Sequence, residues 1–390
     1  MEHAYKDKSI AIIGAGASGC ICAYFLQNIL KERSSLTLFD KASPLRTILP
    51  TGGGRCNLAH AEFDFKELAK NYPRGEKFLY SIFSKFSTID TIKMFEKIGI
   101  KTYIQDNGRI FPESNSAKDV RNIILKELKK INFLKEYVVN IEKLNNGFKV
   151  ITKKENATNS YYFTHVILAL GGRSDYKLVE NLGINIIDPK PSLVGLETKE
   201  NFGDLSGTVV KKAVCEGIND DLLFTHFGVS GPLIYTISSI KAFENFPYKL
   251  NIDICPELIN LQEILNRNPH KEIKNILNNY LPQKVVNYIL KDLDSSIKAC
   301  NINGKTRDSI LNKIHNFDIE VYRTNKGEAT VTAGGINLDE INPKSMEFKK
   351  IPNLYAIGEI LNIDGYCGGF NLQNAWSTAF VCAESFKLEH

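Results

Sequence analysis

The sequence predicts an α/β protein. Its main domain is a Rossmann-like domain that combines a parallel sheet with an antiparallel meander. This domain is interrupted by an inserted small β-barrel-like unit, which carries a helical subdomain. Three observations lead to this prediction. An apolar strand, a glycine-rich turn and an apolar helix follow one another over residues 9–30. A similar succession returns over residues 354–386. Between them, from about Pro189, Pro and Gly residues mark a change of character.

The first turn has the spacing G-x-G-x-x-G. Ile10–Ile13 is an apolar run of the kind that forms a strand buried on both faces, and Cys20–Leu30 continues as an apolar helix. The glycines are Gly14, Gly16 and Gly19. The first allows a tight turn, the second lets the backbone approach a pyrophosphate, and the third lets helix and strand pack closely. Helix amides then face the phosphates. This context predicts a Rossmann-like dinucleotide site; the alternative is a chance glycine-rich turn.

An acidic residue stands where that motif expects one. The second strand, Leu36–Phe39, ends in Asp40. A carboxylate at this position can accept hydrogen bonds from an adenosine ribose and would repel a 2′-phosphate.

Composition is that of an ordinary soluble protein. The 390 residues are 43% hydrophobic and 24% charged, with a formal net charge of +5 that permits nucleic-acid contact without demanding it. The polar start, Met1–Lys8, and the absence of a long apolar run indicate no signal peptide and no membrane span. The eight cysteines lack C-x-x-C spacing and are expected to be reduced thiols in a cytoplasmic protein. Leu388–His390 resembles an expression-vector remnant.

A second glycine-rich stretch, Thr51–Asn57, reads Thr-Gly-Gly-Gly-Arg-Cys-Asn. Its backbone can lie against a flat or anionic ligand, and the alternative is a flexible linker. The following segments predict a helical cap, a hairpin around Asp106–Gly108 and a helix that Ser116 caps. The helices are expected at Phe65–Leu68, Glu76–Phe86, Thr88–Ile98 and Ala117–Lys130.

A three-strand meander is expected next, at Phe133–Leu144, Phe148–Lys153 and Tyr161–Leu170. The last strand delivers Ala169–Gly172 to the sheet edge, which suits a second contact with the same dinucleotide. The sequence downstream contains no second G-x-G-x-x-G. Enzymes with a dedicated nicotinamide domain usually carry two such motifs.

The segment after Pro189 reads as an insertion. Its strands are expected at Thr208–Glu216, Leu222–Phe227 and Leu250–Ile254, followed by short helices within Leu258–Leu290 and at Ser309–His315. The predicted domains are 1–190 with 330–390, a β-rich insertion of 191–250 with 318–332, and a helical subdomain of 251–317. Basic residues are frequent here among acids, and a solvated face is favoured over a nucleic-acid surface. They include Lys291, Lys298, Lys305, Arg307, Lys313, Arg323 and Lys326.

The last segment returns to the style of the first. A short strand, Leu354–Ile357, precedes Gly358–Glu359, and Asp364–Asn371 leads into a helix at Leu372–Phe386. An acid after a strand and glycine can bond a sugar-alcohol chain. A glycine pair at a helix start can place amides beside a developing negative charge.

Four stretches together resemble the BaiN/RdsA (YhiN-type) family, within the flavoproteins that have two dinucleotide-binding domains. They are Thr51–Asn57, Phe224–Pro232, Thr332–Ile336 and Gly368–Leu372. The resemblance spans nearly the whole chain. It implies FAD as the bound cofactor and an active site between the FAD-binding domain and the insertion. The family's usual Gly-Gly-Tyr-Asn has Phe370 in place of Tyr here, and Cys367 receives no role on position alone.

With FAD along the strand ends, the glycine turn faces the pyrophosphate, Asp40 the ribose, Val138 the adenine and Glu359 the ribityl chain. Amides around Gly369–Leu372 face flavin N1 and O2 and stabilise the reduced ring. The full predicted cofactor set is Gly14, Gly16, Ala17, Ser18, Gly19, Asp40, Lys41, Gly53, Gly54, Arg55, Cys56, Val138, Ala169, Leu170, Gly171, Gly172, Gly358, Glu359, Gly368, Gly369, Asn371 and Leu372.

Reduction of a double bond also needs a proton donor. Cys56 is one candidate, with a small packed thiol as the alternative. His226, expected between strand residues and facing the cleft, is the other, with a structural histidine as the alternative. Arg55 is a third candidate for the catalytic site, where it would hold an anionic substrate group or a cofactor phosphate. No metal-ligand spacing occurs, and the histidines at 60, 165, 270 and 315 have no partner pattern.

We therefore expect an FAD-dependent oxidoreductase that reduces an activated carbon–carbon double bond with hydride from flavin N5. NAD(P)H is the expected transient reductant. On the resemblance, the substrate is uridine in ribosomal RNA, which becomes dihydrouridine. The alternatives are an NAD(P)H-dependent small-molecule enone reductase or amine oxidase, and a flavin-carrying RNA-binding factor with little turnover. No membrane association and no stable protein partner are expected.

Overall fold

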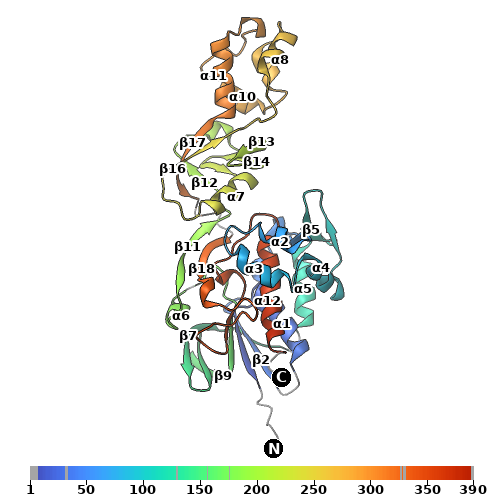
Figure 1. Cartoon of the computed structure of the whole chain (residues 1–390), viewed down its shortest axis with the longest axis vertical. Helices are drawn as coiled ribbons and strands as arrows, with labels where there is room; N and C mark the ends of the chain where they lie inside the picture. The colour runs from blue at the N-terminus through green and yellow to red at the C-terminus, as the bar shows by residue number, and fades with distance from the viewer. Residues whose placement is uncertain are drawn as a thin grey trace, which may run out of the picture. The chain divides into compact units, whose positions relative to one another are not determined.

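The computed structural model describes residues 8–30, 34–128, 131–155, 157–174, 176–325, 327 and 331–387 (Figure 1). The chain divides into two compact units. Unit 1 comprises Met1–Lys190 and Val331–His390, and unit 2 comprises Pro191–Thr330. The division of the insertion at residues 251–317 stays a prediction. Leu388–His390 and Lys326 lie outside the described residues.

Unit 1 is built on a parallel sheet with the strand order β19-β10-β1-β2-β6. The strands are β1 (Ser9–Ile13), β2 (Ser35–Phe39), β6 (Asn132–Leu134), β10 (His165–Leu168) and β19 (Leu354–Ala356). Strand β1 is central, with Ile10 opposite Leu36 on one side and His165 on the other. Its two neighbours lead away in opposite directions along the sheet, so the carboxyl ends of β1 and β10 form the switch point at which such sheets bind ligands. The predicted α/β fold class is confirmed.

Two helices from opposite ends of the chain pack together in unit 1. Helix α1 (Ala17–Ile29) lies along α12 (Phe370–Ser385), and the Phe25 and Phe380 rings meet edge to face at 5.1 Å (Figure 1). They start three and two residues earlier than the predicted Cys20 and Leu372, because each begins directly at its glycine turn. Helix α5 (Ala117–Glu127) starts as predicted, where the Ser116 hydroxyl accepts from the Asp119 amide at 3.2 Å.

The predicted meander needs correction. It consists of β7 (Tyr137–Leu144), β8 (Gly147–Lys154) and β9 (Ala157–Phe163), whereas β6 and β10 belong to the parallel sheet. The first predicted strand breaks at Glu136, whose buried carboxylate accepts hydrogen bonds from side chains of β8 and β9. The third breaks at Thr164, whose amide donates to Ser9 Oγ at 3.0 Å and turns the chain onto β1. Glu136 and Thr164 therefore each divide a segment that its hydropathy predicts as one continuous strand.

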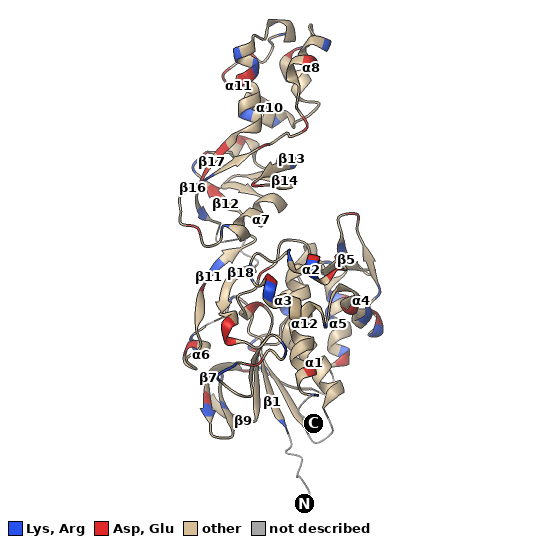
Figure 2. Ribbon diagram, viewed as in Figure 1, with Lys and Arg blue, Asp and Glu red and all other residues tan. Residues whose placement is uncertain are grey.

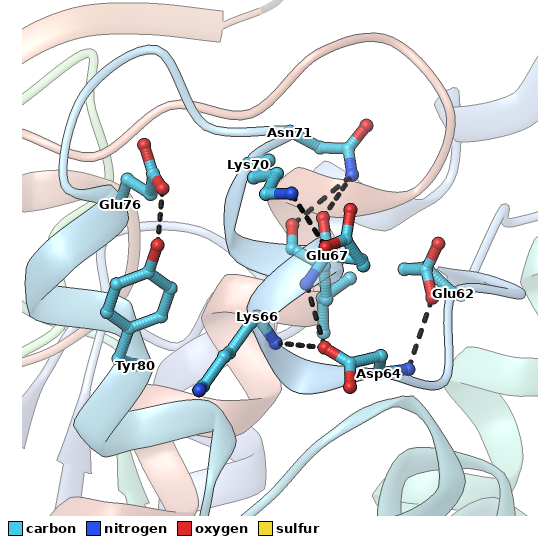
Figure 3. A network of polar contacts seen from close by, with 9 residues as sticks. Glu62, Asp64, Lys66, Glu67, Lys70, Asn71, Glu76 and Tyr80 are labelled. Atoms are coloured by element: carbon cyan, nitrogen blue, oxygen red, sulfur yellow. Dashed lines mark hydrogen bonds and ion pairs between the residues drawn. The ribbon is translucent and has the colours of Figure 1, made fainter.

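The predicted cap consists of α2 (Phe65–Ala69), α3 (Glu76–Phe83), α4 (Thr88–Lys97) and a sheet in the order β3-β5-β4. The strands are β3 (Ala59–His60), β4 (Thr102–Ile104) and β5 (Arg109–Pro112), so the expected hairpin is present with a third strand added. Asp64 caps α2 by accepting from the Lys66 and Glu67 amides, and a surface network of charged side chains surrounds it (Figure 3). These hydrogen bonds hold the pKa of Asp64 below its usual value.

The remaining elements of unit 1 are short. Strands β11 (Ile186–Ser192) and β18 (Val331–Ile336) pair with each other, and α6 (Lys177–Glu180) precedes β11. Short 3₁₀ turns are η1 (Arg46–Ile48), η2 (Thr51–Gly54), η5 (Leu338–Glu340) and η6 (Gly358–Ile360).

Unit 2 has a six-stranded sheet in the order β13-β14-β15-β12-β17-β16. Its edges meet where the Val214 amide donates to the Asp253 carbonyl at 2.8 Å, which gives the predicted barrel-like closure. The strands are β12 (Leu196–Thr198), β13 (Val209–Cys215), β14 (Ile218–Thr225), β15 (Gly228–Ser230), β16 (Tyr248–Ile252) and β17 (Phe317–Thr324). The helices are α7 (Pro232–Ile240), α8 (Leu261–Arg267), α9 (Ile273–Leu277), α10 (Gln283–Ile289) and α11 (Gly304–His315), with the 3₁₀ turns η3 (Gly203–Leu205) and η4 (Ala299–Asn301).

Basic side chains of unit 2 lie among acidic ones (Figure 2). Lys313 Nζ lies 2.9 Å from an oxygen of Asp292, and Arg307 contacts Asp308 at 2.6 Å. Arg323 contacts Glu197 at 2.6 Å. This mixture agrees with the solvated face favoured by the sequence. Among the described residues, no helix is both long and apolar enough to cross a membrane.

Candidate dinucleotide site

The first glycine turn is fixed by close backbone packing. Gly14 has φ +108°, and a Cβ added there would lie 2.2 Å from the Ala169 carbonyl oxygen. A Cβ on Gly19 would lie 1.9 Å from the Gly14 carbonyl oxygen. The fold itself therefore requires glycine at both positions. Gly16 differs, because the nearest atom to an added Cβ is Thr47 Oγ1 at 3.7 Å. The space in front of Gly16 suits a group that is not part of the chain.

The start of α1 offers unused hydrogen-bond donors. Within the described part of the chain, the amides of Ala17, Ser18 and Gly19 have no acceptor. They lie at the positive end of a 13-residue helix, where an anion is stabilised. A pyrophosphate fits this chemistry, and the open space at Gly16 leaves room for it.

Asp40 lies beside this turn as the sequence predicted. One carboxylate oxygen accepts from the Ala15 amide and the other from the Ala42 amide, both at 2.8 Å. Two carboxylate oxygens carry about four acceptor sites, so the group keeps capacity for ribose hydroxyls. Lys41 is exposed, with Nζ 5.2 Å from the Tyr137 ring centre, and Val138 is buried in β7.

The Thr51–Asn57 stretch is a compact turn rather than a linker. Gly53 and Gly54 are exposed and have positive φ. The Arg55 guanidinium lies 4.0 Å from the Phe111 ring centre, and its Nε donates to the Gly52 carbonyl at 3.2 Å. Cys56 is fully buried, and burial raises the pKa of its thiol to about 12 despite a hydrogen bond with the Thr51 side chain. Burial favours the small packed thiol, and donation of a proton by Cys56 stays a prediction.

Glu359 joins the C-terminal motif to the turn after β10. Its carboxylate accepts from the Thr332 amide at 2.9 Å and from the Gly172 amide. Burial raises the pKa of Glu359 to about 7, although both amides and the Arg173 charge act in the opposite direction. Gly172 packs tightly here, since an added Cβ would lie 2.6 Å from Thr332 Cβ. The neighbouring Gly358 packs on Ser18, which links this motif to α1.

The start of α12 offers a second set of free amides. Gly368 and Gly369 have φ +140° and +104°, and a Cβ on Gly369 would lie 2.3 Å from the Ala59 carbonyl oxygen. Within the described residues, the amides of Phe370, Asn371 and Leu372 have no acceptor. The Asn371 side chain is engaged at both ends by the Gly365 backbone, at 2.9 and 2.8 Å. Its side chain therefore closes the preceding loop, while its amide stays available.

The structure brings most of the predicted cofactor set together. Gly14 contacts Ala169, Gly358 contacts Ser18, and Gly172 contacts Glu359, so both chain ends meet at the carboxyl edge of the sheet. Buried polar atoms without a partner lie in this unit too, on Asn57 and Asn374. The described residues contain no group of three or more His, Cys, Asp or Glu placed to hold a metal ion.

His226 needs correction, because it lies in a turn and not in a strand. His226 and Phe227 connect β14 to β15 in unit 2, and His226 is exposed with its ring 5.2 Å from that of Phe227. The two-residue turn places the side chain at a hairpin tip, where hydropathy of the flanking residues gave no sign of a reversal. That His226 faces the cleft stays a prediction.

Sequence reasoning missed His60 as a site residue. Its Nδ1 lies 3.1 Å from the Gly368 carbonyl oxygen, and its ring stacks on Phe370. No spacing in the sequence links residues 308 positions apart. The available signals were the glycines at 108 and 368, whose lack of a side chain leaves room for the His60 ring.

The sheet order, the glycine turn and the paired helix starts define a Rossmann-type nucleotide-binding protein. The family model described as the HI0933-like protein Rossmann domain matches residues 8–385. The chain belongs to this HI0933-like family.

Relatives of known name extend over the full length. The chain is 31% identical to the ribosomal RNA dihydrouridine synthase of Haemophilus influenzae, over 97% of this chain and 98% of that one. It is 29% identical to the protein of the same name from Escherichia coli, over 96% of each chain. It is 26% identical to the 3-dehydro-bile acid delta(4,6)-reductase of Clostridium scindens, over 96% of this chain and 98% of that one.

A solved flavocytochrome c3 fumarate reductase shares the fold, with a TM-score of 0.53 at 13% identity over 98% of this chain and 78% of that chain. Together these comparisons confirm the family resemblance and the oxidoreductase class predicted from the sequence, and they support FAD as the cofactor.

Gly16 provides a direct test of the site. We expect Gly16→Ala to leave the apoprotein folded, because its φ of −77° and its open surroundings accept a methyl group. FAD affinity should fall at least about tenfold, since a methyl group that displaces a bound group costs about 1–3 kcal/mol. Fluorescence titration and thermal melting measure the two effects. Gly19→Ala is the contrast and should fail to fold stably. Wild-type FAD affinity in Gly16→Ala would contradict the assignment.

The raised pKa of Glu359 gives a pH dependence with a defined sign. Because folding raises the pKa of this acid above its ordinary 4.5, its contribution to stability is complete below that value and is lost as pH rises through 7. Glu359→Gln keeps an oxygen for the Thr332 amide and does not ionise. We expect the free energy of unfolding of the variant, relative to that of the wild-type apoprotein, to rise by about 2 kcal/mol between pH 5 and about pH 7.5. Urea unfolding of both proteins measures this difference. Exposed Glu180, changed to Gln, is the control; parallel pH profiles for wild type and Glu359→Gln would refute the prediction.

Proposed function

We propose that this protein is an FAD-dependent reductase that converts uridine to dihydrouridine in ribosomal RNA. The observation that carries the proposal is the meeting of two helix starts, each with free amides, at the carboxyl edge of one parallel sheet. One set suits a pyrophosphate and the other a ring that gains negative charge. The substrate is taken from the two full-length relatives named ribosomal RNA dihydrouridine synthase.

The residues present fit FAD. The α1 amides and the space at Gly16 would hold the pyrophosphate, Asp40 the adenosine ribose, and Glu359 the ribityl hydroxyls. The α12 amides would face N1 and O2 of the ring system. When bound, FAD supplies the redox chemistry, namely two electrons for an activated double bond. The amides of α12 would be fixed dipoles that stabilise the added charge without reorganising.

We further propose that NAD(P)H delivers the electrons transiently. The chain has no second G-x-G-x-x-G, so this reductant would bind without a Rossmann domain of its own. Arg55 would hold an anionic group of substrate or cofactor, and its stacking on Phe111 keeps the guanidinium oriented.

A small-molecule enone reductase is the second candidate. The full-length relative named 3-dehydro-bile acid delta(4,6)-reductase favours it, because a conjugated ketone and a uracil ring both present a double bond polarised by a carbonyl.

The substrate is tested with the holoenzyme. We expect ribosomal RNA fragments to reoxidise the chemically reduced enzyme without oxygen, followed as recovery of flavin absorbance. A strain that lacks the gene should lose one dihydrouridine from its ribosomal RNA. The wild-type gene should restore it, and Gly16→Ala should not. Unchanged dihydrouridine in the deletion strain, with rapid reoxidation by a simple enone, would establish the second candidate instead.

The proton donor can be assigned by two substitutions. Of the two candidates, His226 is exposed, whereas Cys56 is buried with a thiol pKa raised to about 12. We expect His226→Ala to slow reoxidation by RNA by about 10²-fold or more, as loss of a general acid does. Cys56→Ala should retain the rate within a few-fold, and both variants should keep FAD. Stopped-flow absorbance measures the rates. An unaltered rate in both variants would make solvent the proton source.

A further inference from the structure

His60 connects the cap to the start of α12. It ends strand β3, and its Nδ1 lies 3.1 Å from the Gly368 carbonyl oxygen. Its ring stacks on Phe370 with centres 4.6 Å apart and planes inclined by 24°. On its other edge, a Cβ added to Gly108 would lie 2.5 Å from Nε2. The ring is therefore held on one face by Phe370, at Nδ1 by Gly368 and at the Nε2 side by Gly108.

The hydrogen bond defines the tautomer. A carbonyl oxygen can only accept, so Nδ1 of His60 carries the proton. Burial lowers the pKa of His60, as does the Arg109 charge, while the Gly368 carbonyl and the Glu62 charge act in the opposite direction. The neutral ring thus donates through Nδ1 and carries no proton on Nε2.

The bonded carbonyl belongs to the peptide between two glycines. Gly368 and Gly369 carry no side chain and both have positive φ, so no side chain of their own restrains the peptide plane between them. That peptide directly precedes the first amides of α12. Other contacts secure the residues around it: Tyr72 Oη donates to the Phe370 carbonyl at 2.6 Å, and Trp376 Nε1 to the Leu58 carbonyl at 2.9 Å. Among the described side chains, His60 alone bonds the Gly368 carbonyl.

We propose that His60 is a positioning residue that locks the Gly368–Gly369 peptide and thereby keeps the first amides of α12 directed at the FAD ring system. This inference rests on the proposed function for the identity of the ligand. His60 does not touch the reacting atoms; it acts through the glycine loop. The locked dipoles would favour the two-electron-reduced flavin, which carries more negative charge than the oxidised form.

The test separates the hydrogen bond from the stacking. His60→Asn keeps a donor near the Nδ1 position, and His60→Phe keeps the ring and removes the donor. In the holoenzyme, His60→Phe should lose about tenfold in preference for reduced over oxidised FAD, equivalent to about 30 mV for a two-electron couple. His60→Asn should stay close to wild type. Dye-equilibration potentiometry measures both without any substrate.

His165→Phe is the matched control. This histidine starts β10 at the amino edge of the sheet and packs on Phe386 with ring centres 5.3 Å apart. Its potential should equal that of wild type. An unshifted potential in His60→Phe, or an equal shift in His60→Asn, would overturn the proposal.

A second readout needs neither FAD nor a stable Phe variant. In the ¹⁵N-labelled apoprotein, the imidazole signals that disappear in His60→Asn should show a protonated Nδ1 and an unprotonated Nε2. The opposite tautomer would overturn the proposal. Neither the redox potential nor the tautomer measurement involves RNA. If RNA proves not to be the substrate, these results still test the role of His60, so the two proposals can fail separately.

Discussion

The packing of α1 against α12 is the contact on which the rest of unit 1 depends. The two helices come from opposite ends of the chain, and both begin at the carboxyl edge of the same parallel sheet. Because their interface is apolar and tight, it fixes where each helix starts relative to the other. The chain can leave the sheet unit at Lys190 and return at Val331 without disturbing this arrangement. A candidate cofactor site built from both chain ends and a long insertion are thus compatible in one fold.

Helix α12 is buried nearly all round, and its polar residues serve as connectors. Ser377 Oγ donates to the Phe86 carbonyl at 2.8 Å, and Thr378 Oγ1 accepts from the Gly358 amide at 3.0 Å. Trp376 bonds Leu58 in the segment before β3. Each bond satisfies a group that would be costly to bury alone. The cap and the Gly358–Glu359 turn are consequently attached to α12, the helix whose first amides form one side of the candidate site.

Local patterns in the sequence were sufficient for three strands of the parallel sheet, β1, β2 and β19, and for the glycine turn. Ile10–Ile13 and Asp40 follow rules of spacing that survive folding unchanged. Other features depend on distant partners. Glu136 divides a predicted strand because three side chains from β8 and β9 bond it, and His226 sits in a turn only because β15 pairs back on β14. His60 was missed for the same reason, since its partner lies on the far end of the chain. Hydropathy reports burial and period, and it does not report which remote carbonyl a side chain will meet.

Two glutamates, the buried Glu136 and the half-buried Glu359, differ in how many hydrogen-bond donors surround their carboxylates. For Glu136, burial alone would raise the pKa, but donors on Thr152, Asn159 and Tyr161 more than offset it and leave the pKa below its usual value. Among the described residues, Glu359 accepts hydrogen bonds from two backbone amides, and burial raises its pKa to about 7. Glu136 is fully supplied and anchors the meander. Glu359 has acceptor capacity left over in a place where unmet acceptors are costly. Hydroxyl groups of a sugar-alcohol chain are donors of the kind that would meet this need, which agrees with the proposed contact between Glu359 and the ribityl chain of FAD.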